Sequence, residues 1–327
     1  MEIPRRQFLH LAVGAAAALP AISRVAGAQV YPTRPVRIMV GFAPGGATDT
    51  IARPMGQWLS ERLGKSFIIE NRPGAASNLA TEAVARAPAD GHTLLMIGPT
   101  QVMNITLYER LNFDFLRDIA PVGGVTRASL VMVVNPSVPA KTAAEFIAYA
   151  KASPGKINMA SSGNGSINHI AAELLKMMTG INMAHVPYRG GAPAMTDLIG
   201  GQVQMLMATM ASSIEYVRTG KVRALAVTAT KRSALLPDVP PLAEAVPGFE
   251  VNDWYGIGAT KGTPANIIDK LNREIGAALV DPKMTDRLAL IGGVPMPMMP
   301  VEFGKFMANE AEKWSKVIRT AGIKGAE

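Results

Sequence analysis

The feature that most constrains the fold of this chain is a regular alternation of short apolar runs with amphipathic helical patterns. The first series of runs and helical patterns covers, in chain order, residues 36–42, 48–63, 67–70, 77–87 and 93–98. In the first helical pattern Ile51, Met55 and Leu59 recur on one face, as expected for a helix that packs on a sheet. A β-α-β-α-β order predicts a parallel sheet with right-handed crossover connections.

A second series of the same character begins at residue 130. It consists of a strand at 130–136, a helix at 142–152, a strand at 157–161, a helix at 167–179 and strands at 183–187, 203–208 and 222–227. Four prolines between residues 231 and 253 exclude regular structure there, so we expect this stretch to run between lobes. The chain then closes with a strand at 254–259 and helices at 264–280 and 300–321.

These two series predict the fold class α/β with two lobes, each a mostly parallel sheet flanked by helices. The length of 327 residues agrees, because it is about twice that of a usual domain. The segment from residue 254 onward has no boundary of its own, so we expect it to return to the first lobe. The expected division is 29–127 plus 254–327 for lobe 1 and 128–253, with the hinge return, for lobe 2. Two chain crossings then form the hinge.

The N-terminus has the pattern of an export signal. Arg5 and Arg6 precede an apolar run at 11–19, and small residues follow at 26–28. This order predicts a signal peptide of the twin-arginine type over residues 1–28, and hence a periplasmic protein. The apolar run is shorter than the ~20 residues that span a bilayer, which argues against a membrane anchor.

Charge and motif content exclude several classes of partner and cofactor. The net charge is +8, but no Lys/Arg cluster is interleaved with aromatic residues, so we expect no nucleic acid partner. We also expect the protein to be a monomer. The chain has no cysteine and no nucleotide-binding glycine motif, and we expect no cofactor. His92, His169 and His185 lack metal-ligand spacing, so no metal is expected. His92 lies in a turn that we expect to be exposed. His185 lies in an apolar strand, where we expect it to be a core residue.

Four glycine-rich loops follow expected strands, at residues 43–49, 74–78, 161–166 and 188–192. In parallel sheets ligands bind beyond the carboxyl ends of the strands, where helices begin. Small residues let the backbone approach a ligand, and free N–H groups at a helix start favour an anion. The loops can equally be ordinary helix starts in which Thr48, Ser77 and Ser166 are caps. Because all four share this character, we expect an anion clamp with donors from both lobes.

The candidate ligand-binding residues lie in these loops, in the first turns that follow them and after the strands at 93–98 and 203–208. They are Phe42, Ala43, Pro44, Gly45, Gly46, Ala47, Thr48, Asp49, Ser77, Asn78, Thr100, Gln101, Ser162, Gly163, Asn164, His169, Tyr188, Arg189, Gly190, Ala208 and Thr209.

Catalysis is the alternative class of function. The chain contains no G-x-S-x-G elbow and no S-x-x-K pair, so we expect a binding protein and no catalytic residue. A periplasmic hydrolase or isomerase that uses His169 or Asp49 as a base stays open as the second hypothesis. A purely structural or interaction module, the third, has no need of two lobes with facing glycine-rich loops.

Six segments together resemble one known family. They are 42–49 (FAPGGATD), 71–75 (NRPGA), 89–95 (ADGHTLL), 162–166 (SGNGS), 186–194 (VPYRGGAPA) and 236–240 (LPDVP). In this order, over nearly the whole mature chain, they are similar to the substrate receptors of tripartite tricarboxylate transporters, also called Bug proteins.

The resemblance implies a two-lobe periplasmic binding protein fold, type II-like, that closes on its ligand. The ligands it implies are small carboxylates: dicarboxylates, amino acids or aromatic acids. The loop at 42–49 would hold the carboxylate, partly through water, with lobe 2 closing over it. Membrane transporter subunits, or a sensor kinase, would be the partners.

Two positions depart from the family pattern. Ala76-Ser77 replaces a frequent Gly-Gly, and Ala208-Thr209 stands where an acidic residue is common. Loss of that acid disfavours a ligand with an ammonium group, so we expect a dicarboxylate or an aromatic carboxylate.

Overall fold

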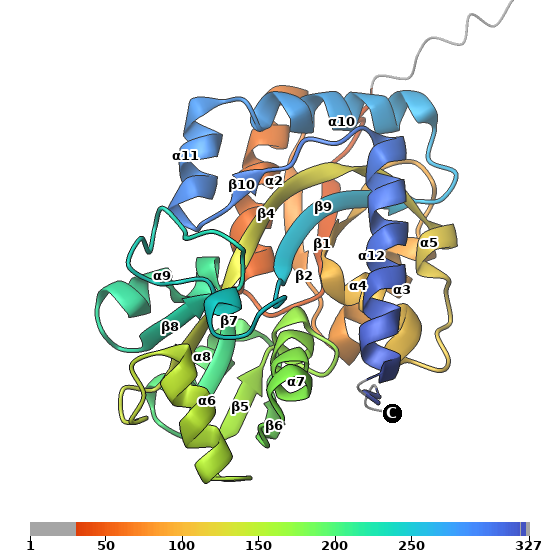
Figure 1. Cartoon of the computed structure of the whole chain (residues 1–327). Coiled ribbons are helices and arrows are strands. Elements are labelled where there is room, and N and C mark those ends of the chain that lie inside the picture. The colour runs from red at the N-terminus through yellow and green to blue at the C-terminus, as the bar shows by residue number, and fades with distance from the viewer. Residues whose placement is uncertain (1–30, 321, 325–327) are drawn as a thin grey trace, which may run out of the picture.

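The computed structural model describes residues 31–320 and 322–324, and the signal peptide expected at 1–28 lies outside them. The chain forms two α/β lobes, drawn one above the other in Figure 1 and joined by two strands, β4 (Ile119–Val134) and β9 (Asn252–Thr260). The prediction of two α/β lobes is therefore confirmed.

Lobe 1, the upper lobe in Figure 1, is built from both ends of the described chain. Besides parts of β4 and β9 it contains β1 (Val36–Val40), α2 (Ala47–Leu63), β2 (Phe67–Asn71), η1 (Ala75–Ser77), α3 (Asn78–Ala85), β3 (Thr93–Ile97), α4 (Pro99–Leu107), α5 (Phe115–Asp118), α10 (Ala265–Ala278), α11 (Pro282–Leu290), β10 (Val294–Pro295) and α12 (Pro300–Thr320). Strand β1 pairs in parallel with β2 and β3, as the β-α-β-α-β pattern predicts. Strand β9 is antiparallel to both β3 and β4.

Lobe 2 is contributed by one continuous stretch of chain. Its elements are α6 (Ala143–Ala152), β5 (Asn158–Ser161), α7 (Ile167–Thr179), β6 (Ala184–Pro187), α8 (Gly191–Ile199), β7 (Met205–Thr209), α9 (Met210–Arg218), β8 (Arg223–Val227) and η2 (Leu242–Glu244). Strands β6, β5 and β7 are parallel, whereas β7 and β8 run antiparallel to β4.

Strand β4 passes through both sheets and is longer than the sequence pattern predicts. We expected a strand from residue 130, but β4 begins at Ile119 and pairs with β9 along most of its first half. The register shifts between Pro121 and Gly123 and again between Gly124 and Thr126. Such bulges, with their glycines and proline, hide the period-2 pattern from sequence analysis.

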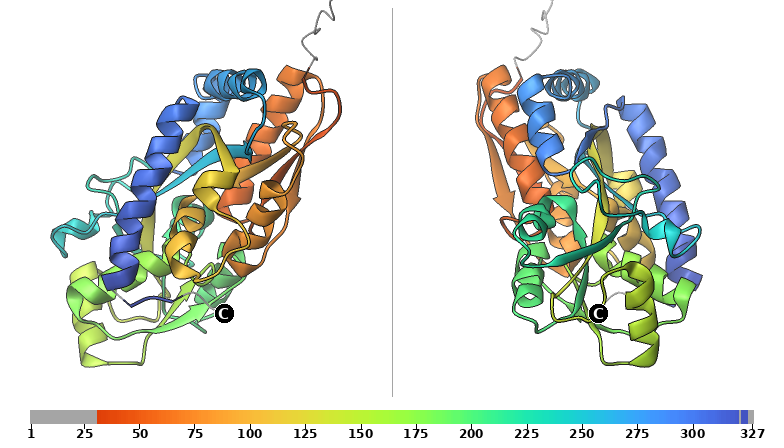
Figure 2. Two further views of the ribbon diagram at one scale, coloured as in Figure 1. Left: turned by 90° about the vertical axis from the view of Figure 1, so that its right-hand side faces the viewer. Right: turned by 60° about the vertical axis from the view of Figure 1, so that its left-hand side comes forward.

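Helices cover both faces of the lobe 1 sheet, as Figure 2 shows. On one face α2 buries Ile51, Met55 and Leu59, and on the other α12 buries Phe303 and Trp314. Helix α12 lies directly on β9, because a Cβ at Gly256 would stand 2.2 Å from the Phe303 ring. The core beneath α12 is continuous with the core of lobe 2.

Four helices of nine residues each, α4, α8, α9 and α11, have no counterpart in the sequence prediction. Helices α4 and α9 start within one residue of the strand before them, so no loop marks their beginning. Helices this short are marginal in isolation and depend on tertiary packing. Three of them, α4, α8 and α9, begin at the cleft between the lobes.

Candidate ligand-binding site

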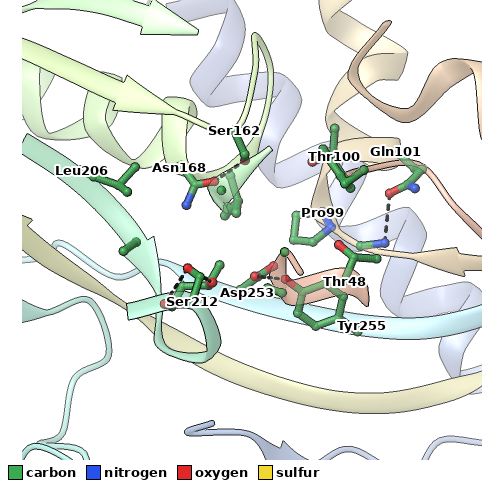
Figure 3. A pocket seen from close by; sticks show the side chains of 18 residues that line it. Thr48, Pro99, Thr100, Gln101, Ser162, Asn168, Leu206, Ser212, Asp253 and Tyr255 are labelled. Atoms are coloured by element: carbon green, nitrogen blue, oxygen red, sulfur yellow. Dashed lines mark hydrogen bonds between the residues drawn. The ribbon is translucent and has the colours of Figure 1, made fainter. Parts of the chain in front are cut away.

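A pocket lies between the two lobes, bounded by loops of both and by β9 (Figure 3). Its lining consists of Phe42, Gly46, Ala47, Thr48, Gly98, Pro99, Thr100, Gln101, Ser162, Ile167, Asn168, Gly191, Leu206, Ala208, Thr209, Ser212, Asp253 and Tyr255. Lys, Arg and His are absent from this lining, and Asp253 is its one charged residue.

The positive character of the pocket comes from the backbone. Five helices begin in the lining: α2, α4, α7, α8 and α9. The start of a helix carries unpaired N–H groups and the positive end of the helix dipole. At α2, α8 and α9 no side chain caps these groups, so their N–H donors are free for a ligand. Convergent helix starts of this kind form an anion site without a cationic side chain.

The lobe 1 wall is held by a buried carboxylate outside the pocket lining. Asp49 is 2% exposed and accepts four hydrogen bonds. Its Oδ2 accepts from Gly45 N at 3.0 Å and Arg53 Nε at 2.7 Å, and its Oδ1 from Arg53 Nη2 at 2.8 Å and Asn71 Nδ2 at 2.9 Å. Burial raises the pKa of Asp49, but the donors of Arg53, Gly45 and Asn71 together outweigh burial and hold the pKa below its ordinary value. Asp49 therefore fixes the loop that faces the ligand.

A second pair of contacts fixes the start of α4. Gln101 Oε1 accepts from Gly98 N at 2.9 Å, and Gln101 Nε2 donates to Ser77 Oγ at 2.9 Å. Ala75, Ala76 and Ser77 all have positive φ, between 45° and 74°. That conformation favours glycine, which gives a physical reason for the Gly-Gly expected at positions 76 and 77 in this family. In this chain Ser77 instead packs on Gly41, where a Cβ would clash with Ser77 Oγ.

The lobe 2 wall is held by neutral hydrogen bonds. The Ser162 hydroxyl donates to Asn168 Oδ1, and Asn168 Nδ2 donates to the carbonyl of Met207. Thr209 Oγ1 and Ser212 Oγ are 2.8 Å apart. These contacts join the loop after β5 and the start of α7 to the end of β7, so the carboxyl ends of two neighbouring strands present one surface to the pocket.

The floor of the pocket is formed by β9. Asp253 is 1% exposed, and its Oδ1 accepts from Trp254 N at 3.0 Å while its Oδ2 accepts from the Tyr255 hydroxyl. Burial raises the pKa of Asp253 to about 7, although the donors of Tyr255 and Trp254 act in the opposite direction. Sequence analysis missed Asp253. The signal that could have found it is an acidic residue at the start of an otherwise apolar strand.

Nine candidate residues from the sequence line the pocket between the lobes. They are Phe42, Gly46, Ala47, Thr48, Thr100, Gln101, Ser162, Ala208 and Thr209. Five more line an adjacent cavity, which shares Phe42 and Ser162 with the first: Ser77, Gly163, Asn164, Tyr188 and Arg189. The loops after β1, β5 and β6, together with the start of α3, are thus brought to one cleft.

Seven candidate residues lie outside the lining of both cavities: Ala43, Pro44, Gly45, Asp49, Asn78, His169 and Gly190. Asp49 and Gly45 are bonded to each other, and Asn78 Oδ1 accepts from Asn104 Nδ2 at 2.7 Å. At Gly190 a Cβ would lie 3.4 Å from Ala43 Cβ, so these two residues meet across the cleft. Their places suit residues that position the loops, and direct contact of these residues with a ligand stays a prediction.

His169 and His185 pack on each other in lobe 2 and line neither cavity. The prediction of His185 as a core residue is wrong, because it lies partly buried on the edge strand β6. His169 stacks on His185 with ring centroids 3.8 Å apart, and His169 Nδ1 accepts from Gly165 N. Burial, followed by the neighbouring His169, lowers the pKa of His185 to about 4. Ser161 Oγ lies 2.7 Å from His185 Nε2, but Ser161 is fully buried and lines neither cavity. His92 was expected to be exposed and is buried instead.

Two further observations concern metal ions and membranes. Across residues 31–320 and 322–324, no three His, Cys, Asp or Glu side chains lie together as a metal-binding group. Over the same residues, no helix combines the length and the apolar character that crossing a bilayer requires.

Known proteins resemble this chain over nearly its full length. A model of the tripartite tricarboxylate transporter family receptor matches residues 51–323. BugT of Bordetella pertussis is 35% identical over 315 residues, which cover 95% of this chain and 97% of BugT.

Two solved structures share the fold closely. Rpa4515 of R. palustris with adipate matches with a TM-score of 0.87 at 37% identity, over 90% of this chain and 99% of that chain. MatC (Rpa3494) from Rhodopseudomonas palustris with bound malate matches with a TM-score of 0.84 at 32% identity, over 88% of this chain and 100% of that chain. The expected periplasmic binding protein fold is confirmed. The chain is a solute-binding receptor and not an enzyme, and it belongs to the tripartite tricarboxylate transporter receptor family.

Proposed function

We propose that this receptor captures a small dicarboxylate or aromatic carboxylate in the pocket between its lobes. The observation that carries the proposal is that five helices begin in the lining of a pocket with no cationic side chain, and that three of them, α2, α8 and α9, have no side-chain cap. Backbone donors that are already in place solvate a carboxylate without a cost of reorganisation, and they recognise it independently of the rest of the molecule.

The pocket and the relatives both favour a small acid. Phe42, Ile167, Leu206 and Tyr255 supply apolar surface for a carbon chain or ring, as is usual in small-molecule sites. Rpa4515 with adipate and MatC with malate support a dicarboxylate. Backbone donors alone do not distinguish an aliphatic from an aromatic acid.

Capture would occur by closure about a hinge. We assign residues 29–127 and 254–327 to lobe 1 and residues 128–253 to lobe 2, with the crossings near Ala128 and Asp253, which are paired partners in β4 and β9. The lobes touch at the rims of the cleft, where Gly190 faces Ala43 and a Cβ at Gly165 would clash with Leu107. Glycines at these contacts let the two lobes approach each other.

Location and partners follow from the N-terminal pattern and from the family. The twin-arginine type signal at 1–28 and the family support a monomeric periplasmic receptor that passes its ligand to the membrane subunits of a tripartite transporter. A sensor kinase is the alternative partner.

The test is a binding titration with adipate, malate and benzoate, with 1,6-hexanediol as the uncharged control. We expect one acid to bind one-to-one, to be recovered unaltered and to stabilise the protein by about 2.7 kcal/mol at a hundredfold excess over Kd. Turnover of the bound acid, or stabilisation by the diol alone, would contradict the proposal.

A variant pair localises the site. Thr100→Asp places a carboxylate at the start of α4 inside the pocket, so we expect binding to weaken at least about tenfold through like-charge repulsion. Asn266→Asp adds the same charge to the exposed first turn of α10, away from the pocket, and should leave the affinity unchanged. Equal effects of the two substitutions would place the anion elsewhere.

A further inference from the structure

Asp253 places an acidic group inside a pocket built for an anion. We propose that Asp253 is a specificity-determining residue: it carries a proton when the ligand is bound and donates a hydrogen bond to it, so that each carboxylate binds together with one proton. This inference rests on the proposed function and deepens it.

The geometry places the Asp253 carboxyl where it can meet the ligand. Asp253 lies in the pocket lining beside Thr48, Ser212 and Tyr255 (Figure 3). Each of its oxygens already accepts one hydrogen bond from the protein, from Trp254 N and from the Tyr255 hydroxyl. A proton on either oxygen needs an acceptor, and a carboxylate in the pocket supplies one.

No cation among the described residues offsets the charge of Asp253. Its partner in β4 is Ala128, and the neighbouring groups from α2 and α9 are the hydroxyls of Thr48 and Ser212. Tyr255 is the one titratable side chain in contact with it, and burial, followed by the Asp253 charge, raises the pKa of Tyr255 well above its ordinary value. The phenol therefore stays neutral and acts only as a donor.

A second carboxylate in this space makes the ionised form of Asp253 costly. Two carboxylates that share one dry site cannot both ionise near neutral pH, and one of them takes up a proton. In the empty pocket Asp253 is the one acidic residue of the lining, and its charge is supported by the Trp254 amide and the Tyr255 hydroxyl. A bound anion adds a second negative charge to this space, so at a pH where Asp253 is ionised a proton enters from solvent with the ligand.

Another reading of the same carboxyl is an ionised partner for a ligand ammonium group. The five positive helix ends oppose a cation in this pocket, and no second acidic residue lines it. We therefore favour the protonated form, and the ammonium partner becomes an outcome of the test.

The experiment is isothermal titration calorimetry with adipate, malate, benzoate and L-glutamate between pH 6.5 and pH 8.5, a range in which their carboxyl groups are essentially ionised. With a pKa of about 7 for Asp253 in the empty pocket, the affinity for the carboxylate that binds should fall about 25-fold across this range. Titrations at pH 8 in buffers of different ionisation enthalpy should show uptake of about 0.9 proton per anion bound.

Three variants separate this role from a structural one. Asp253→Asn should bind with a pH-independent affinity and take up no proton. Tyr255→Phe removes a donor to the ionised carboxylate, so the midpoint of the pH profile should move to higher pH. Glu310→Gln is the matched control, because Glu310 accepts from the Trp254 ring on the other side of β9, and it should keep the profile of the unmodified protein.

The outcomes are distinct. Binding of a carboxylate with no change in affinity from pH 6.5 to 8.5 overturns the proton inference but leaves the proposed function intact. Binding of L-glutamate alone, lost in Asp253→Asn, also overturns it and assigns Asp253 to an ammonium group. Failure of all four acids to bind at pH 6.5 overturns both proposals.

Discussion

Two buried aspartates next to the same pocket are held in opposite ways. At the start of α2, Asp49 accepts four hydrogen bonds, two of them from Arg53, and its pKa is lowered. At the start of β9, Asp253 accepts two bonds from uncharged groups, and its pKa is raised to about 7. Both side chains are almost completely removed from solvent. Asp49 nevertheless lies near the surface, beside the half-exposed Arg53, whereas Asp253 is enclosed by protein on all sides. The depth of burial and the charge and number of the donors together decide the protonation state.

The difference separates a structural acid from a ligand-facing one. Asp49 directs its charge away from the pocket and fixes the loop at 42–49, whereas Asp253 lines the pocket and keeps its protonation free to respond to a ligand. A buried carboxylate whose charge is paired with a cation and several donors stabilises the fold at neutral pH. A buried carboxylate without a cationic partner lowers the stability of the fold at that pH.

The largest effect is expected for Asp49→Ala. It leaves the Gly45 amide, the Asn71 side chain and the Arg53 guanidinium without their shared acceptor, so the free energy of unfolding should fall by about 3 kcal/mol. Carboxylate affinity should also fall, because the loop at 42–49 loosens. Urea unfolding at pH 7 measures the first effect. Glu215→Gln, which breaks an exposed pair with Arg218, should change stability by less than about 0.5 kcal/mol.

For Asp253→Asn we expect a change of opposite sign. The raised pKa means that the folded protein holds the Asp253 proton between about pH 4 and pH 7, so the unmodified protein loses stability as pH rises through this window. The variant should then be more stable by roughly 2–4 kcal/mol at pH 8.5, and the gap should narrow toward pH 4. Denaturation curves at several pH values measure the gap. A difference in unfolding free energy that becomes larger toward low pH would show that the pKa of Asp253 is not raised in the folded protein.

An intermediate effect is expected for Tyr255→Phe. At pH 8.5, where Asp253 is ionised, loss of the phenol donor should destabilise the protein by about 1–2 kcal/mol. At pH 5 the carboxyl is neutral, and the loss should be smaller. Urea or thermal unfolding at pH 8.5 and at pH 5 measures the two losses in the free energy of unfolding. Equal losses would show that the hydrogen bond from the hydroxyl does not depend on the charge of Asp253.

The smallest effect is expected for Arg53→Lys. The Arg53 side chain is 54% exposed, and lysine keeps the positive charge but loses the bidentate contact with Asp49, so stability should fall by about 1 kcal/mol or less. Arg62→Lys, which alters an equally exposed contact with Glu274, serves as the control and should have an effect below about 0.5 kcal/mol. If the two changes are alike, the Asp49 site does not depend on bidentate geometry.

Sequence analysis located most of the strands and longer helices but few of the short helices. The patterns of β1, α2 and β3 were sufficient because each is a continuous apolar or amphipathic run. Helices α4, α8 and α9 were missed, although their first residues build the pocket, because nine residues carry too few helical repeats to stand out. Many of the candidate residues from the glycine-rich loops line the cavities between the lobes.

Sequence analysis was less successful with the charged groups. Asp49 was expected at the ligand because it follows the glycine-rich loop, but its carboxylate is used by Arg53, Asn71 and Gly45. Asp253 was not considered at all. A position next to a loop in the sequence does not tell which way a side chain points. Asn71 reaches Asp49 only because the fold pairs β1 with β2, and the Tyr255 hydroxyl reaches Asp253 only in the side-chain conformation that the structure shows.

By itself the sequence indicated the α/β class, the family and the glycine-rich loops whose small residues let the backbone of both lobes approach an anion. Local periodicity, turn chemistry and composition carry that information, since each acts over a few neighbouring residues. Only the tertiary structure decided that five helix starts from both lobes line one pocket, and how deeply the two aspartates are buried beside it. Those properties depend on packing between segments far apart in the chain, and electrostatic free energies depend on the resulting distances and on the exclusion of water.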